Sequence, residues 1–187
     1  EGLSLIRRLR RARLPWFTGA TRLRIEGEDR VCALAFESGG HARLLPAGLV
    51  LLHHGVVPDT QLSRLLRVDH DWSDAQLAWL PRTDRWGQTS LAGFRIAGDG
   101  AAIAGALAAQ SAGTLAALGA AHELGFLTPA DRDAQAAPVR DALRRQRRIR
   151  PFLDALYRPP ESITNPPDDV IVCRCEEVSA GRLRELV

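Results

Sequence analysis

A carboxylate within a glycine-flanked turn is the feature of this sequence best suited to ligand binding. The apolar segment 93–97 (GFRIA) is expected to be a strand, Gly98-Asp99-Gly100 follows it, and a helix is expected from Ala101. Glycines let a ligand approach the backbone, and the free N–H groups of a helix N-terminus favour phosphate. The Asp99 carboxylate can accept hydrogen bonds from polyol hydroxyls. The turn therefore suits FAD, whose ribityl chain lies next to its diphosphate.

The same turn also has a purely structural interpretation. Asp99 could be the N-cap of the following helix, since an N-cap carboxylate accepts a hydrogen bond from the first turn. The segment is not the dinucleotide fingerprint Gly-x-Gly-x-x-Gly, because Ile103 stands where the third glycine should be. Residue types and spacing alone leave ligand binding and capping equally open.

A Cys-x-Cys pair, Cys173 and Cys175, follows the apolar residues 170–172. Thiolates at this spacing can ligate an iron–sulfur cluster, but two ligands do not hold one. A structural zinc site would also need four ligands, and no His pair with suitable spacing lies nearby. Cys32 brings the total to three cysteines, which does not predict a disulfide framework and fits a reducing compartment. We therefore expect a cytoplasmic protein.

Hydrophobic periodicity and chain breakers predict the elements that must position these residues. The expected elements are a helix over 3–14, a hairpin over 21–36, a short buried parallel strand over 49–52, a long helix over 101–124, a basic helical region over 132–156, a Pro-rich linker over 159–167, and a last helix capped by Ser179. Gly125 is expected to end the first long helix.

Charge and composition narrow the function classes. The chain has 187 residues, a net charge of +3 and no lysine, and its arginines concentrate in the runs 7–13 and 140–150. Such runs can bind nucleic acid, but a solvated helix face is the simpler interpretation, so no nucleic-acid partner is expected. Residues 100–121 carry no charge. We expect no membrane span there, because most of these residues are Ala, Gly, Ser or Thr.

Two motifs resemble the glutathione reductase-like class of flavoproteins, which have two dinucleotide-binding domains. Residues 89–99 resemble the second flavin motif of that class, in which a Thr lies ten residues before an Asp and an apolar strand runs into Gly-Asp. Residues 49–62 (LVLLHHGVVPDTQL) are similar to the motif where the chain returns from the NAD(P)-binding domain. The resemblance implies FAD bound by Gly98, Asp99, Gly100 and Ala101.

The last residues of the chain indicate a narrower family within this class of flavoproteins. Residues 169–186 (DVIVCRCEEVSAGRLREL) resemble the start of a bacterioferritin-associated-ferredoxin-like module, which holds a [2Fe-2S] cluster with a Cys-x-Cys and a later Cys-x-x-Cys pair. A flavin domain followed by this module resembles the FAD-containing subunit of opine oxidases, hydrogen cyanide synthase and related amino-acid dehydrogenases. Residues 147–160 (RRIRPFLDALYRPP) are like the segment that joins the two parts in those proteins.

That resemblance implies an enzyme. Hydride transfer to FAD from an amine, an amino acid or an opine would be followed by electron transfer through the cluster. A second, substrate-oxidising flavoprotein subunit is the expected partner. Two alternatives rest on fewer residues: a non-enzymatic iron–sulfur or metal-binding electron-transfer module, based on Cys173 and Cys175, and a basic interaction domain, based on the arginine runs.

The expected fold class is α/β, as a fragment of a two-dinucleotide-binding-domain flavoprotein that is inactive alone. Residues 1–58 would end an NAD(P)-binding-like domain, and 59–130 would form the C-terminal half of the FAD domain. Residues 131–167 would be a helical connector and linker, and 168–187 the start of the [2Fe-2S] module.

Other residues are weaker candidates. His53 and His54 follow the predicted strand over 49–52 and could face a flavin, although histidines at strand ends are more often structural. Cys32 is expected to be a buried, inert thiol. Packing is the expected role of the tryptophans, Trp72, Trp79 and Trp86.

The resemblance makes a prediction about the gene. The chain begins with Glu1 rather than Met, apparently within a helix. We expect the complete gene to encode Gly-x-Gly-x-x-Gly near its start and Cys-x-x-Cys some tens of residues after Val187. Sequencing beyond both ends tests this, and a reading frame that stops at Val187 would contradict the iron–sulfur assignment.

Overall fold

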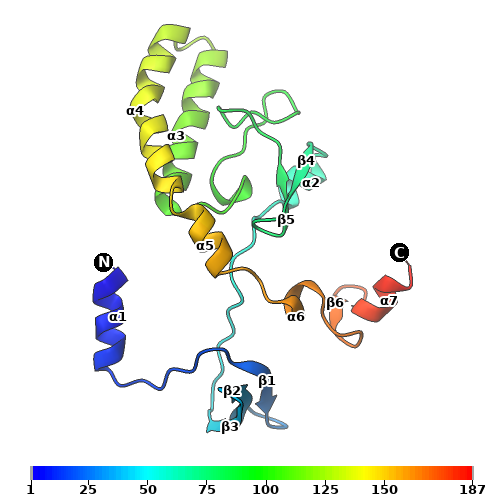
Figure 1. Cartoon of the computed structure of the whole chain (residues 1–187). Helices are drawn as coiled ribbons and strands as arrows, with labels where there is room; N and C mark the ends of the chain where they lie inside the picture. The colour runs from blue at the N-terminus through cyan, green and yellow to red at the C-terminus, as the bar shows by residue number, and fades with distance from the viewer. Residues whose placement is uncertain (1, 187) are drawn as a thin grey trace. The chain divides into compact units, whose positions relative to one another are not determined.

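The computed structural model describes residues 2–186 as a mixture of helices and small antiparallel sheets (Figure 1). This content is consistent with the expected α/β class. The chain divides into two compact units, one ending at His53 and the other beginning at His54, and each is described by itself. The bounds of the four expected domains stay predictions.

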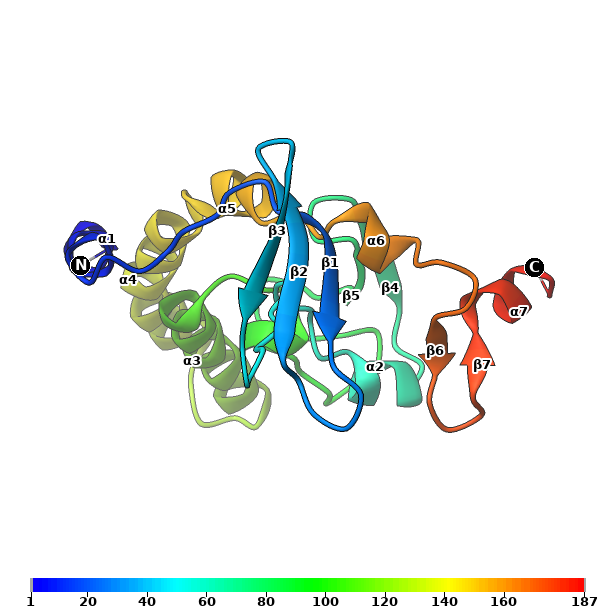
Figure 2. The ribbon, with the colours of Figure 1, turned by 90° about the horizontal axis from the view of Figure 1, so that it is seen from below.

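The first unit contains a helix and a three-stranded antiparallel sheet. Its elements are α1 (Gly2–Arg11), β1 (Thr21–Glu26), β2 (Ala33–Ser38) and β3 (His41–Pro46), and the sheet has the order β1-β2-β3 (Figure 2). The predicted hairpin is confirmed as β1 and β2. The third strand was not predicted. It follows a turn at Gly39 and Gly40, whose φ angles of 61° and 76° suit the tight connection between two antiparallel strands.

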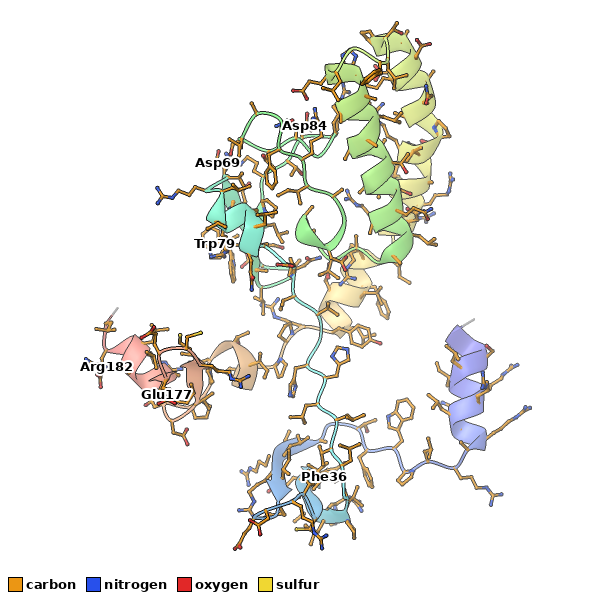
Figure 3. The ribbon with its side chains drawn as sticks, turned by 180° about the vertical axis from the view of Figure 1, so that it is seen from behind. Phe36, Asp69, Trp79, Asp84, Glu177 and Arg182 are labelled. Atoms are coloured by element: carbon orange, nitrogen blue, oxygen red, sulfur yellow. The ribbon has the colours of Figure 1, made fainter. Side chains whose placement is uncertain are left out.

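Phe36 on β2 is the buried centre of this unit (Figure 3). Its ring lies edge-on to Phe17, with 5.0 Å between the ring centroids. The guanidinium of Arg43 covers the other ring at 5.2 Å from the Phe17 centroid. Two aromatic rings and a cation therefore make up a small core.

The predicted parallel strand over 49–52 is wrong. Residues 49–60 have no regular secondary structure, and Leu49 and Leu51 are 73% and 85% exposed. A parallel strand exists only when neighbouring strands satisfy its backbone groups, and no described strand pairs with this segment. His53 and His54 lie in the same extended, exposed stretch.

The second unit is built around a hairpin of two long helices. Before this hairpin come α2 (Gln61–Leu65), the strands β4 (His70–Ser73) and β5 (Ala78–Pro81), and the 3-10 turn η1 (Gly98–Gly100). The hairpin itself is α3 (Ala106–Glu123) and α4 (Pro129–Arg147), and α5 (Arg150–Leu156) follows. Thr128 caps α4, because its hydroxyl accepts a hydrogen bond from Asp131 N at 3.1 Å.

The core of this unit lies where the two long helices meet a loop. Trp86 from the loop, Leu115 from α3 and Ala136 from α4 are buried together. Leu118, Val139 and Leu143 pack against them. Gly119 permits this packing, since an added Cβ there would lie 2.8 Å from the Cβ of Trp86.

Two element predictions in this unit need correction. Residues 93–97 form no strand. Among the described residues, their strand-like pairing is limited to one isolated bridge between Arg95 and Gln88. The helix after the turn begins at Ala106 rather than Ala101. Its end is as predicted, with Gly125 at φ 80° donating its N–H to His122 O. The helical region predicted over 132–156 is confirmed, and it contains most of α4 and all of α5.

The last part of the chain is a short hairpin between two short helices. It contains α6 (Glu161–Thr164), β6 (Ile171–Cys173), β7 (Val178–Ser179) and α7 (Ala180–Arg184). Ser179 caps α7 as predicted, with its hydroxyl 3.2 Å from Arg182 N. Within residues 2–186, no helix is long and apolar enough to cross a membrane.

The packing of α3 on Trp86 gives a matched pair of substitutions. Gly113→Ala should stabilise the protein by up to about 1 kcal/mol, because alanine is the better helix former and no atom lies within 4 Å of the added Cβ. Gly119→Ala should instead destabilise it by about 1–3 kcal/mol through overpacking against Trp86. Urea unfolding of both variants measures the difference. Equal stabilisation by both would contradict the Trp86 contact.

Candidate functional site

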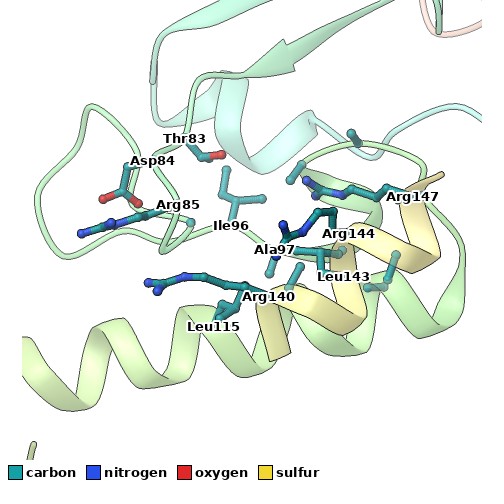
Figure 4. Close-up of a pocket in the computed structure, with 18 of the residues that line it drawn as sticks. Thr83, Asp84, Arg85, Ile96, Ala97, Leu115, Arg140, Leu143, Arg144 and Arg147 are labelled. Atoms are coloured by element: carbon teal, nitrogen blue, oxygen red, sulfur yellow. The ribbon is translucent and has the colours of Figure 1, made fainter. Parts of the chain in front are cut away.

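A cleft of about 640 Å³ in the second unit is the best-formed candidate site (Figure 4). It lies between the loop 83–87, the segment 96–104, and the helices α3 and α4. Two kinds of residue dominate its lining. The small ones are Gly87, Ala97, Gly98, Ala101, Ala102, Ala104, Ala108, Ala109 and Ala112, and the cationic ones are Arg85, Arg140, Arg144, Arg147 and Arg148.

The small residues keep the backbone close to the cleft. Gly98 has φ 71° in the left-handed region, and an added Cβ would lie 3.4 Å from the Cβ of Ala109. Gly87 is also left-handed, and a Cβ there would meet Ile96 O at 2.6 Å. Ile96 N donates to Gly87 O at 2.8 Å, which holds these two segments together. Glycine is therefore required at position 87 and favoured at position 98.

The four residues of the predicted flavin turn are not all in one place. Gly98 and Ala101 line the cleft, whereas Gly100 lines a second cavity of about 590 Å³ beside α2. Asp99 is exposed and lines neither cavity, and no described residue hydrogen-bonds its carboxylate. The capping alternative is wrong, because the N-cap of α3 is Gly105.

Gln76 positions the segment that precedes α3, and sequence reasoning missed it. Its amide Nε2 donates to Ile103 O at 2.7 Å, and its Oε1 accepts from Ile103 N at 3.0 Å. The side chain thus satisfies both backbone groups of one residue, as a neighbouring strand would. No local signal marks Gln76, because the two residues are far apart in sequence and Gln76 lies in the turn between β4 and β5.

Trp86 organises the arginines at one end of the cleft. The guanidinium carbons of Arg132 and Arg140 each lie 4.4 Å from its ring centroid. Arg132 also donates to Asp133 at 2.9 Å, and this hydrogen bond lowers the pKa of the Asp133 carboxyl below its usual value. In the described chain, Arg140 Nε and Nη2 are buried without a hydrogen-bond partner. Stacking on the indole holds that guanidinium in place.

Asp84 fixes the loop that carries Trp86. Its Oδ1 accepts hydrogen bonds from Trp86 N at 2.7 Å and Gln88 N at 2.9 Å. Most of the acceptor capacity on that oxygen is therefore used within the loop. The tryptophan prediction is confirmed for Trp86, which packs in the core, while Trp72 and Trp79 form a half-exposed edge-to-face pair on β4 and β5 with centroids 5.7 Å apart.

The two tail cysteines lie at one end of the β6–β7 hairpin. Cys173 is half-buried at the end of β6 and Cys175 is exposed, and both are free thiols. Across residues 2–186, no group of three or more His, Cys, Asp or Glu side chains could hold a metal ion. In the described residues, Cys173 and Cys175 are thus not joined by a third potential metal ligand. Cys32, predicted to be buried, is exposed, with its sulfur 3.5 Å from Glu26 O.

The arrangement of the cleft suits an anion attached to a larger body. Five arginines provide positive charge, and the glycine and alanine wall admits a bulky group close to the backbone. A cleft of this volume falls in the range of about 300–1,000 Å³ that is typical of small-molecule sites.

Comparison with known proteins gives three informative relatives. The chain is 39% identical to the A subunit of opine oxidase from Rhizobium meliloti over 91% of its own length and 32% of the relative. It is 39% identical to the A subunit of opine oxidase from Agrobacterium tumefaciens (strain Ach5) over 100% of its length and 37% of the relative. It is 29% identical to the HcnB subunit of hydrogen cyanide synthase from Pseudomonas aeruginosa over 75% of its length and 30% of the relative.

The chain therefore spans about a third of the length of these curated relatives. No family model matches it, and no solved structure matches it. The relatives are named as subunits of multi-subunit enzymes. Along its own length, the chain is therefore similar to part of the A subunit of opine oxidases and, at lower identity, to part of HcnB.

Proposed function

We propose that the chain is part of an FAD-dependent oxidoreductase that oxidises an amine, an amino acid or an opine with the help of a partner subunit. The observation that carries this proposal is the 39% identity to the A subunit of two opine oxidases along 91% and 100% of the chain. Similarity over the whole chain includes the helical hairpin, the cleft and the Cys-x-Cys tail.

The glycine turn would hold part of the flavin. FAD supplies the acceptor for a hydride from the carbon next to the amine nitrogen, while the protein supplies binding and orientation. Gly98 and Ala101 would let the cofactor approach the backbone at the cleft. The Asp99 carboxylate is exposed next to Gly98 and has no partner in the described chain, so it is available to accept hydrogen bonds from ribityl hydroxyls.

The cysteines would connect the flavin to an electron acceptor. Cys173 and Cys175 would provide two of the thiolate ligands of a [2Fe-2S] cluster, which carries electrons singly. Cys175 is exposed and Cys173 is half-buried, so neither residue is fully enclosed by the described part of the chain.

Replacement of Asp99 tests the flavin assignment in the complete gene product. Asp99→Ala should weaken FAD binding by roughly 10- to 150-fold, because a hydrogen bond to a charged group is worth about 1.5–3 kcal/mol. The melting temperature should hardly change, since Asp99 is exposed and caps neither η1 nor α3. The measurement is bound flavin per protein after dialysis.

Asp29→Ala is the matched control, because it removes an exposed carboxylate in the turn between β1 and β2. It should retain the flavin of the wild type. Full flavin occupancy in Asp99→Ala after the same dialysis would contradict the assignment of Asp99.

Replacement of the cysteines tests the cluster separately. In the complete gene product, Cys173→Ser and Cys175→Ser should each lose most of the bound iron and the visible absorbance of the cluster, because a thiolate ligand is missing. Cys32→Ser, which removes the other exposed thiol, should leave both unchanged. Iron analysis next to the absorbance spectrum gives the answer, and wild-type iron content in Cys173→Ser would remove the cluster from the proposal.

A further inference from the structure

The short helix α5, which follows the two long helices (Figure 1), exposes large apolar side chains. Ile149 at its N-cap, and Phe152 and Leu156 within it, are 56%, 62% and 57% exposed. Spacings of three and four residues place these three side chains on one face of the helix. We call them the outer face of α5. Tyr157, at the C-cap, adds an exposed aromatic ring at the end of the helix.

The opposite face of α5 is charged, which reverses the usual arrangement of a surface helix. Arg150 Nε donates to Asp154 Oδ1 at 2.8 Å, and both side chains of this ion pair are largely buried. A surface helix normally turns its apolar stripe toward the protein and its charges toward solvent. Large apolar side chains that are exposed together mark interaction sites. The described residues therefore leave the outer face uncovered, and it suits contact with another apolar surface.

Proline and two hydrogen bonds hold this region in place. Pro151 lies in the first turn of α5, where its fixed φ suits the helix. Arg158 Nη1 donates to Asp74 O at 2.9 Å, which ties the end of α5 to the turn between β4 and β5. Trp72, one of the half-exposed tryptophans, donates to Asp74 Oδ1 at 2.9 Å. A face of fixed shape loses little conformational entropy on binding, so it suits a complementary protein surface better than a fluid bilayer.

The surroundings of the outer face are basic. Residues 142–160 contain one carboxylate, Asp154, which is already paired with Arg150. Six arginines occur in the same range: Arg144, Arg145, Arg147, Arg148, Arg150 and Arg158. A two-fold contact with a second copy of the chain would bring the same patch together from both sides, and like charges across an interface are unfavourable. Charge complementarity therefore favours a different protein, with carboxylates around an apolar hollow.

We propose that the outer face of α5 docks the partner subunit of the enzyme, in an apolar hollow of that subunit with a rim of Asp and Glu. The relatives are named as subunits of multi-subunit enzymes, and the need for a partner in oxidation rests on the proposed function. Phe152 and Leu156 fill the hollow, and exposed arginines such as Arg145 face the rim. An apolar centre with a polar rim is the usual anatomy of an interface.

The test uses the complete gene product and its partner subunit, separated from the purified holoenzyme and mixed again. Phe152→Ala should weaken their association about tenfold or more, because a few central side chains carry most of the binding energy. Its melting temperature without the partner should hardly change, since the side chain is exposed. Unchanged affinity overturns the docking site and leaves the flavoprotein assignment intact.

Phe126→Ala is the matched control. Phe126 is 78% exposed in the turn between α3 and α4. That turn lies at the other end of α4, whose 19 residues span about 28 Å. The control removes the same side chain from another part of the surface, so it should bind the partner subunit as the wild type does. Equal losses in Phe126→Ala and Phe152→Ala would also overturn the docking site.

Arg145→Glu tests the acidic rim. Arg145 is exposed and does not line the cleft, so flavin content should stay that of the wild type. Association with the partner subunit should be several-fold slower at low salt, and the difference should shrink at high salt, because rim charges act mainly on the rate of encounter. An association rate equal to that of the wild type at low salt would contradict the rim of carboxylates.

Other occupants of the outer face predict other effects of Phe152→Ala, and each would overturn the proposal. Coverage by the rest of the same polypeptide predicts a lower melting temperature of the gene product alone, with partner affinity unchanged. Coverage by a second copy predicts a changed oligomeric state of the gene product alone. Coverage by a membrane predicts that binding to phosphatidylglycerol vesicles is lost.

Flavin content of the same samples separates this proposal from the proposed function. A holoenzyme that contains no flavin but loses its partner subunit in Phe152→Ala keeps the docking site and refutes the proposed function. A holoenzyme that contains flavin and one kind of chain refutes the docking site and the partner subunit together, while the flavin assignment stands.

Discussion

The structure of the second unit depends on the burial of Trp86. The guanidinium groups of Arg132 and Arg140 each lie over its ring, and an added Cβ at Gly119 would lie 2.8 Å from its own Cβ. One side chain therefore joins the loop to both long helices. Asp84 ties the backbone of that loop to itself, so the loop that lines the cleft also carries the indole into the core.

A second constraint comes from outside the helices. Gln76 reaches across from the β4–β5 hairpin and bonds both backbone groups of Ile103. These two hydrogen bonds use the backbone N–H and C=O of Ile103, which a helix would otherwise use, and α3 begins only at Ala106. A residue from the turn of the small two-stranded sheet thereby holds the segment that leads into α3.

The sequence was informative where local chemistry decides the structure. The hairpin of β1 and β2, the glycine after α3 and the Ser179 cap depend on near neighbours and were predicted correctly. The failures concern tertiary partners. Residues 49–52 and 93–97 have apolar strand character, but a strand also needs a neighbour, and local sequence does not reveal whether one is present.

The candidate site also combines features that local sequence predicts with features that depend on tertiary contacts. Residue types single out the turn at Gly98, and this glycine lines the cleft, while the ligand of the turn stays a prediction. The arginines of α4 that line the cleft were noticed only as a basic run, because a charged helix face looks the same in sequence whether it meets solvent or a cleft. Only the contact of α4 with the loop and α3 distinguishes the two.

The use of arginine alone for positive charge gives the cleft a particular behaviour. Arginine presents a planar set of N–H donors, so the five lining arginines favour ligands that carry several acceptor oxygens, such as phosphates and carboxylates. The cleft also has no primary amine in a chain without lysine, so it can neither form an imine with a carbonyl compound nor be neutralised by acetylation.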